Sequence, residues 1–283
     1  MLKIKSFTFN AFQENTYVVS LDNKCFIVDP GNSSDEENEE LMLYISSNKL
    51  IPEYVLITHC HVDHVLGTNF LTTSFSIKAY LPESEKKIYD EMVSYAPLFG
   101  FENYNNSKDI KYITKDSKLL FNGLDVDILL LPGHSPGHLA FYFDRAKKCF
   151  SGDVIFKNSI GRTDLPGGNY EILINSIKNE LFLLDDNVQI YPGHGPITNI
   201  YDELNNYNGL DTTDLENLTS KNNVFNICNA SLPHRTKFRL ISCLILILIA
   251  GNRRKMFPYL LAFHVCVGVS STSNTCNWIN GLI

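Results

Sequence analysis

A short histidine-rich segment is the first feature of the sequence that could carry out chemistry. Residues 58–64 read THCHVDH and place four potential metal ligands within six positions, namely His59, His61, Asp63 and His64. Imidazole and carboxylate donors without thiolate suit zinc, iron or manganese. So many donors at this spacing predict a metal site rather than four unrelated polar residues.

Three further candidate donors follow short apolar segments later in the chain. His134 and His194 each follow a Pro-Gly pair, and Asp153 follows Gly152. Because these residues lie far from residues 58–64 in the sequence, the site must be assembled by folding. Seven donors are too many for one tetrahedral ion, and they suit two ions that share a bridging carboxylate.

Two other residues near these donors have more than one interpretation. Cys60 lies between two of the donors and could be a soft ligand. Because neighbouring side chains along the segment alternate in direction, the Cys60 side chain is expected to point away from the two donors, which favours a packed, reduced thiol. His138, in the segment SPGH, is expected to support the site or the fold rather than to bind an ion. A single buried histidine is usually a hydrogen-bonded core residue, whereas a cluster of this size is costly to bury without a counter-charge.

The elements that must position these donors can be read from the apolar segments before them. Residues 54–58 lead directly into the histidine-rich segment, and residues 188–191 lead into His194. Side chains that follow the ends of rigid strands can be aimed at a common point. Periodicity and turn residues predict strands over 2–9, 16–21, 25–28, 54–58, 123–131, 140–143, 149–150 and 188–191, and helices over 34–48, 83–95 and 170–184.

The composition is that of a globular protein with an acidic balance. The 283 residues include 24 Lys and Arg against 31 Asp and Glu, which gives a net charge of −7. A nucleic-acid-binding surface requires a basic face, so we expect no nucleic-acid partner. Seven cysteines without a CxxC pair favour reduced thiols. Reduced thiols predict a cytoplasmic protein. Residues 1–10 alternate instead of forming an apolar segment, which argues against a signal peptide.

The character of the chain changes near residue 209. Acidic side chains outnumber basic ones before this point, whereas the reverse holds for residues 210–283. The apolar runs 240–250 and 256–269 are each shorter than the roughly 20 residues that span a bilayer. They leave open a weak membrane contact or an extra packed element. We expect a domain of residues 1–209 and an atypical tail of residues 210–283 with little order.

The motifs, taken in order, resemble those of a known family. THCHVDH, LPGHSPGH, SGDVIF and YPGHGP are similar to the motifs of the metallo-β-lactamase superfamily, and DPG at residues 29–31 resembles its turn. SIGRTDLPGG, at residues 159–168, resembles the glyoxalase II-like branch. The resemblance covers roughly residues 1–209. It implies an α+β fold, a four-layer αββα sandwich with the metal site at one edge of the two sheets.

The resemblance also assigns the ligands. It implies that His59, His61 and His134 bind one metal ion and that Asp63, His64 and His194 bind the other, with Asp153 bridging. The cofactors would then be two divalent ions per chain, for which zinc is the first expectation and iron or manganese the alternatives.

The implied activity is hydrolysis of an acyl thioester, such as S-lactoylglutathione or another S-2-hydroxyacylglutathione. Metal ions lower the pKa of water, so that it becomes a nucleophile at neutral pH, and Asp63 is expected to orient it. The leaving thiolate has a pKa of about 8.5 and needs no strong general acid. Arg162 either pairs with a carboxylate of the substrate or forms a structural pair with Asp164.

Other functions on the same fold stay open. A glutathione persulfide dioxygenase would share a similar GRTD string, but it uses a single iron held by two His and one Asp. Residues 165–168, LPGG, look more like the hydrolase branch. Hydrolysis of a β-lactam or a lactone is another possibility, because the same nucleophile attacks any accessible activated acyl group. A non-catalytic role is disfavoured by the complete ligand set.

Overall fold

The first of two large sheets is built from the N-terminal part of the chain. The computed structural model describes residues 1–208. Six strands pair in the order β1-β2-β3-β4-β5-β6. The pairs from β1 to β3 are antiparallel, whereas those from β3 to β6 are parallel. The strands are β1 (Lys3–Phe9), β2 (Glu14–Leu21), β3 (Lys24–Val28), β4 (Ile51–Leu56), β5 (Lys78–Pro82) and β6 (Ile110–Ile113).

The second sheet also has six strands, in the order β14-β13-β10-β9-β8-β7. Its only parallel pair among the described residues is β10 with β13. A separate hairpin, β11 (Ile155–Phe156) and β12 (Ser159–Ile160), follows β10. The sheet strands are β7 (Leu119–Phe121), β8 (Leu124–Leu130), β9 (Leu139–Phe143), β10 (Lys148–Gly152), β13 (Gln189–Pro192) and β14 (Thr198–Asn199).

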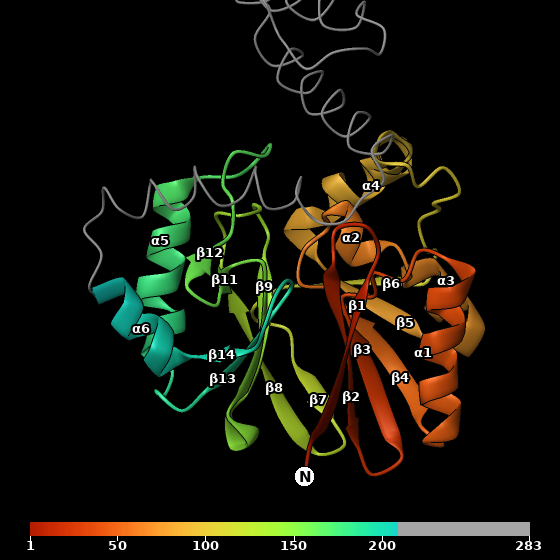
Figure 1. Ribbon diagram of the computed structural model, residues 1–283, viewed down its shortest axis with the longest axis horizontal. Coiled ribbons are helices and arrows are strands. Elements are labelled where there is room, and N and C mark those ends of the chain that lie inside the picture. Colours follow the sequence, from red (N-terminus) through yellow and green to blue (C-terminus); the bar gives the residue numbers. More distant parts are fainter. Residues whose placement is uncertain (209–283) are drawn as a thin grey trace, which may run out of the picture. The chain divides into compact units, whose positions relative to one another are not determined.

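Helices cover the outer faces of both sheets. Figure 1 shows α1 and α3 outside the first sheet, α5 and α6 outside the second, and the two sheets facing each other between them. This arrangement confirms the predicted αββα sandwich. The α-helices are α1 (Asp35–Ser47), α2 (Val62–Val65), α3 (Thr68–Phe75), α4 (Lys86–Tyr95), α5 (Tyr170–Asn179) and α6 (Ile200–Asn208).

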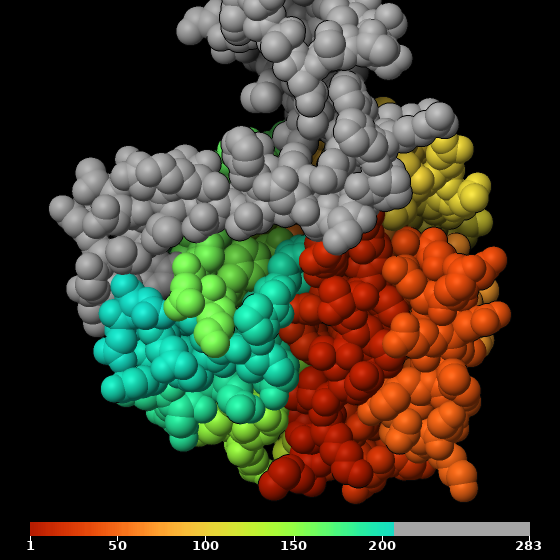
Figure 2. Space-filling model, viewed as in Figure 1, coloured from red at the N-terminus to blue at the C-terminus, as the bar shows by residue number. Residues whose placement is uncertain are grey.

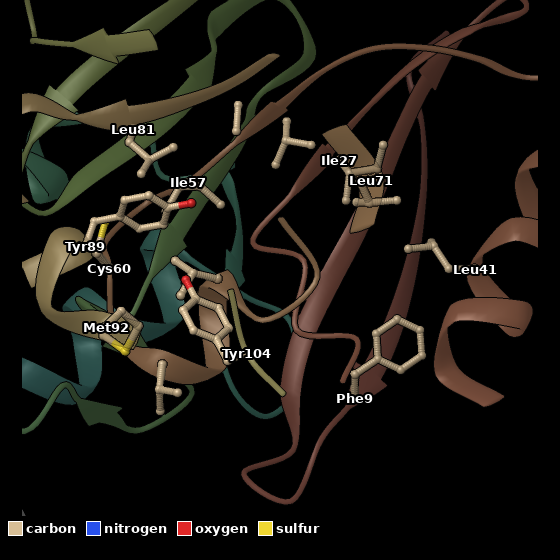
Figure 3. Close-up of a cluster of buried hydrophobic side chains, with 14 of the residues drawn as sticks. Phe9, Ile27, Leu41, Ile57, Cys60, Leu71, Leu81, Tyr89, Met92 and Tyr104 are labelled. Carbon is tan, nitrogen blue, oxygen red and sulfur yellow. The ribbon is translucent and has the colours of Figure 1, made fainter. Parts of the chain in front are cut away.

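Three apolar clusters hold the four layers together. Between the first sheet and its helices, Ile27 and Ile57 pack with Leu41 of α1, Leu71 of α3 and Met92 of α4 (Figure 3). The second cluster fills the space between the sheets, and the third packs the second sheet against α5. Because both faces of each sheet are covered, the strands that lead to the predicted donors are rigid supports.

Aromatic side chains dominate the cluster between the sheets. The Phe26 ring stacks on Tyr54 of its own sheet with ring centroids 5.3 Å apart, and it meets Phe121 of the other sheet at 4.7 Å and 79°. Phe143 stacks on Phe26 at 5.7 Å. Such contacts between aromatic rings fix the two sheets face to face.

The two sheets also meet through hydrogen bonds near the ends of β2 and β13. The N–H of Asn15 donates to the carbonyl of Gly193 at 2.7 Å, and the Tyr17 hydroxyl donates to the carbonyl of Pro192 at 2.7 Å. In Figure 2 the red surface of the N-terminal strands lies directly beside the cyan surface of residues near 190–208. These contacts bring segments that are about 180 positions apart in the chain to one edge of the molecule.

Several predicted elements have other bounds in the structure, and the helix predicted over 83–95 begins as a 3-10 turn, Glu83–Glu85, before α4. The helix predicted over 170–184 ends at Asn179, after which Leu181–Leu183 form a 3-10 turn. Glu180 leaves the helical conformation at φ −128° and ψ −60°, and the sequence has no Gly or Pro there to signal the stop. The strand predicted over 54–58 is β4, which ends at Leu56.

The predictions for the tail, residues 210–283, lie outside the described residues. The boundary at residue 209 and the interpretation of the two apolar runs therefore stay predictions. Within residues 1–208, none of the helices combines the length and the hydropathy that crossing a membrane requires.

Candidate metal centre

The histidine-rich segment follows β4 and turns directly into α2. Asp63 and His64 lie on this short helix, for which His61 is the N-cap residue. The carboxylate of Asp29, just after β3, accepts the N–H of Thr58 at 2.7 Å and also the Thr58 hydroxyl. The carboxyl ends of the adjacent parallel strands β3 and β4 thus hold the start of the segment in place.

The other three donors also follow strand ends, as predicted. His134 comes after β8, Asp153 after β10 and His194 after β13. Gly193 is required beside them, because a Cβ atom there would lie 2.1 Å from Asp153 Oδ1 and 2.6 Å from His64 Cε1. The Pro-Gly-His sequence therefore lets the backbone of this loop approach the other donors closely.

Three imidazole nitrogens converge in the first group of donors. His59 Nε2 lies 3.0 Å from His61 Nδ1 and 3.2 Å from His134 Nε2. His61 Nδ1 and His134 Nε2 are 2.8 Å apart. Three nitrogen donors meeting at one point form the type of site that binds zinc in catalytic centres with an open position.

The second group combines a carboxylate with two imidazoles. His194 Nε2 lies 3.1 Å from Asp63 Oδ2, and His64 Nε2 lies 3.7 Å from the same oxygen. Asp153 stands between the two groups: its Oδ1 is 3.4 Å from His64 Nε2, and its Oδ2 is 3.6 Å from His134 Nε2. The fold thus brings all seven predicted donors together, with one carboxylate facing both groups.

Hydrogen bonds behind the donors fix three of the rings. These contacts join His64 Nδ1 to Asp29 Oδ2 at 3.1 Å, His134 Nδ1 to the Arg162 carbonyl at 2.8 Å and His194 Nδ1 to the Gln13 carbonyl at 3.2 Å. Carbonyls and carboxylates only accept, so each Nδ1 carries the proton. In the neutral form of such a ring the lone pair is then on Nε2, which faces the cluster, and this is the form that binds a metal ion.

The electrostatics of the cluster favour a positive charge at its centre. Burial and the neighbouring imidazoles lower the pKa of His59 well below its usual value and that of His61 to about 3. Burial also disfavours charge on His64 and His194, but the nearby carboxylates outweigh it and hold both pKa values well above the usual range. Burial opposes ionisation of Asp63, yet His64 and His194 lower its pKa to about 2.

The buried polar atoms of the cluster fit divalent metal ions. His64 Nε2 and Asp153 Oδ1 are buried and have no hydrogen-bond partner among the described residues. Unsatisfied buried groups of this kind are costly, and a cation between them removes the cost. The ionised carboxylates and the neutral rings of His59 and His61 are in the protonation states that metal ligands need.

The remaining predicted residues have distinct surroundings. The guanidinium of Arg162 donates to both carboxylate oxygens of Asp164, each at 2.7 Å. Of the two predicted partners of Arg162, the structure therefore shows the pair with Asp164. Cys60 lies in the apolar cluster between sheet and helices, and burial raises the pKa of its thiol well above the usual value. His138 stacks on His59, and its Nε2 accepts the N–H of Asp153 at 3.1 Å.

Several supporting residues were not predicted from the sequence. Asn10 donates through Nδ2 to the carbonyls of Gly31 at 3.0 Å and Asp63 at 3.2 Å, and it has a positive φ of 53°. Glu85, which is fully buried, accepts hydrogen bonds from two of the ligand-bearing loops. Asp29 belongs to a turn that the sequence did show, and its position just after a strand is the signal that could have identified it.

Comparison with known proteins agrees with this fold and this donor set. A profile of the metallo-beta-lactamase superfamily matches residues 9–194. Over 205 residues the chain is 35% identical to hydroxyacylglutathione hydrolase GloC of Haemophilus influenzae, covering 71% of this chain and 95% of that protein.

Two solved structures of similar proteins share the architecture. The crystal structure of the B3 metallo-beta-lactamase BLEG-1 aligns with a TM-score of 0.66 and 31% identity, over 72% of this chain and 97% of that one. The structure of TTHA1623 in a di-iron-bound form aligns with a TM-score of 0.62 and 32% identity, over 71% and 96% of the two chains. From the motifs, the converging donors and these relatives, the chain belongs to the metallo-beta-lactamase superfamily and is a metallo-hydrolase with a metal-binding fold.

Proposed function

We propose that this chain is a glyoxalase II-like thioester hydrolase that acts on S-2-hydroxyacylglutathione esters such as S-lactoylglutathione. The similarity to a hydroxyacylglutathione hydrolase over 95% of that protein's length supports this substrate class. The acidic net charge of −7 supports a small-molecule substrate and no nucleic-acid partner. Cys25, Cys60 and Cys149 are buried free thiols, which supports a cytoplasmic location.

The proposal includes two divalent metal ions, with zinc as the first candidate. His59, His61 and His134 would hold one ion, and Asp63, His64 and His194 the other. Asp153 carries this assignment, because its two carboxylate oxygens face donors of both groups at 3.4 to 3.6 Å. The di-iron-bound form of a relative at 32% identity supports the number of ions and keeps iron a candidate.

The residues around the ions divide the remaining work. Bound ions of this kind lower the pKa of water and polarise a substrate carbonyl. Asp63 stays ionised across the physiological range, because its pKa is lowered to about 2, and it can accept a hydrogen bond that orients the attacking water. The departing thiolate has a pKa of about 8.5, so the chain needs no strong general acid to protonate it.

Arg162 has two connections to the site in this proposal. Its carbonyl orients His134, and two of its N–H groups are engaged by Asp164. The guanidinium has five N–H donors, so those not used by Asp164 can still contact a carboxylate of the glutathione moiety. The side chain is 23% exposed, which makes such a contact accessible from solvent.

The test combines metal content with substrate turnover. Mass spectrometry of the purified protein is expected to find two zinc-type ions per chain, and S-lactoylglutathione is expected to release free glutathione. The proposal would be wrong, and the dioxygenase alternative right, if the protein contained one iron per chain, consumed oxygen with glutathione persulfide as substrate and did not cleave thioesters. Cleavage of a chromogenic β-lactam without thioester cleavage would favour a β-lactamase, which the 31% identity to BLEG-1 makes the second candidate.

A further inference from the structure

A fully buried carboxylate links two of the ligand-bearing loops. Glu85 lies where the 3-10 turn Glu83–Glu85 passes into α4, and its side chain has no exposed surface. Its Oε2 accepts the N–H of Cys60 at 3.1 Å, and its Oε1 accepts the N–H of Gly137 at 2.6 Å. The partners are 25 and 52 positions away in the chain, so one side chain joins three distant segments.

Both N–H donors belong to backbone beside metal-ligand candidates. Cys60 is flanked by His59 and His61, and Gly137 lies in the loop that begins after β8 and carries His134. The contact is close, since a Cβ atom at Gly137 would lie 2.9 Å from Glu85 Cγ. The distances of 2.8 to 3.2 Å between the three imidazole nitrogens therefore depend on two loops that one carboxylate holds together.

We propose that Glu85 is a positioning residue for the ion held by His59, His61 and His134. Its two oxygens fix the spacing between the loops of this group, and that spacing sets the affinity for the ion. The inference rests on the ligand assignment in the proposed function. It concerns the affinity and selectivity of the site rather than the substrate.

The second group of donors is held by other contacts. Asp29 fixes His64 through Nδ1, Asn10 holds the carbonyl of Asp63, and the Gln13 carbonyl orients His194. None of these contacts passes through Glu85. Loss of the Glu85 carboxylate is therefore expected to weaken the binding of the ion held by His59, His61 and His134 and to leave the binding of the other ion unchanged.

The substitution Glu85→Gln tests this directly. Gln keeps the length and shape but has a single acceptor oxygen, so one of the two N–H groups faces an amide NH2 instead. Competition with a zinc chelator is expected to show one ion bound about 10- to 100-fold more weakly, as is usual for residues that hold metal ligands. The visible spectrum of the cobalt-substituted protein is expected to change for one ion only.

Glu203→Gln is the matched control. Glu203 is also fully buried and accepts hydrogen bonds from the N–H of Asn158, at 2.9 Å, and from the Thr198 hydroxyl, but it joins α6 to segments without metal-ligand candidates. This variant is expected to lower the unfolding temperature and to bind both ions as the wild type does. A Glu85→Gln protein that binds both ions like the wild type, or loses both equally, would overturn the proposal.

A second variant and two further outcomes separate the role of Glu85 from the proposed substrate and the ligand assignment. If Glu85→Gln does not fold, Glu85→Asp retains the charge but is one methylene too short to reach both N–H groups, and it is judged by the same chelator titration and cobalt spectrum. Selective loss of one ion in a protein that does not cleave thioesters would support the role of Glu85 and refute only the substrate. If the wild-type protein binds a single ion, the assignment of ligands to two ions is wrong, and this inference is wrong as well.

Discussion

At the scale of single residues, Asp153 decides whether the two groups of donors act as one centre. Its oxygens face His64, His134 and His194, and its side chain is buried. We expect Asp153→Ala to lose both ions and nearly all activity, because the carboxylate that is removed faces donors of both groups.

Metal content by mass spectrometry measures this effect independently of turnover. Asp144→Ala is the control, since Asp144 is an exposed carboxylate that pairs with Lys147 away from the donors. That variant is expected to keep both ions. If Asp153→Ala retained both ions, the bridging role would be misassigned.

The local patterns that made the donors predictable do not mark all of the residues that support them. Seven imidazoles and carboxylates at strand ends are unusual enough to be recognised one by one. Glu85, in contrast, lies in the sequence ESEKK, which is typical of the exposed first turn of a helix. Its burial results from the approach of two loops from elsewhere in the chain, and no local pattern contains that information.

At the scale of elements, local patterns predicted the helices and strands that alternate strongly or begin with a clear cap. The hairpin of β2 and β3 and the helix after Ser34 are examples. Nine of the described α-helices and strands were not predicted, namely α2, α3, α6, β5, β6, β7, β11, β12 and β14. The strands among them and the four-residue helix α2 are too short to show a period, and their conformation is set by pairing and by contacts with distant segments. The helices α3 and α6, of eight and nine residues, were missed although they are longer.

The start of α1 offers a test of whether a local sequence pattern, the helix cap, stabilises the element that it predicts. The Ser34 hydroxyl accepts the N–H of Glu37 at 3.3 Å, and the Glu37 carboxylate in turn accepts the N–H of Ser33 at 2.6 Å. Removing the cap in Ser34→Ala is expected to lower the free energy of unfolding by about 1 kcal/mol, measured by urea denaturation. Metal content should not change, because α1 carries none of the predicted donors.

Ser46→Ala provides the comparison within the same helix. The Ser46 hydroxyl is exposed and donates to the Leu43 carbonyl within the same helix, so Ala at this position is expected to be neutral or slightly stabilising. Equal losses of stability in the two variants would mean that the cap of α1 contributes nothing specific.

At the scale of the whole molecule, the centre is built where the edges of two sheets meet. Asn15 of β2 contacts Gly193 and Gly195 beside His194, across almost the full length of the described chain. The αββα layering was implied by family resemblance, whereas composition and periodicity alone gave only the alternation of strands and helices. Which sheet edges meet depends on long-range packing such as that of Phe26 against Phe121, which a single sequence does not display.

This architecture makes a prediction for the part of the chain that follows it. All seven predicted donors lie within residues 1–208, and the family profile matches residues 9–194. A variant of residues 1–210 is therefore expected to keep its metal content and its rate of thioester hydrolysis, since both sheets and their covering helices are retained.

A shorter variant shows where the catalytic unit ends. Ending the chain at residue 199 would remove α6, including Ile200 and Glu203, whose side chains are fully buried against the second sheet and its hairpin. That variant is expected to unfold at lower urea concentration, whereas the 1–210 variant should unfold with the same midpoint as the domain in the full chain. Loss of both metal and turnover in the 1–210 variant would instead place residues 211–283 within the catalytic unit.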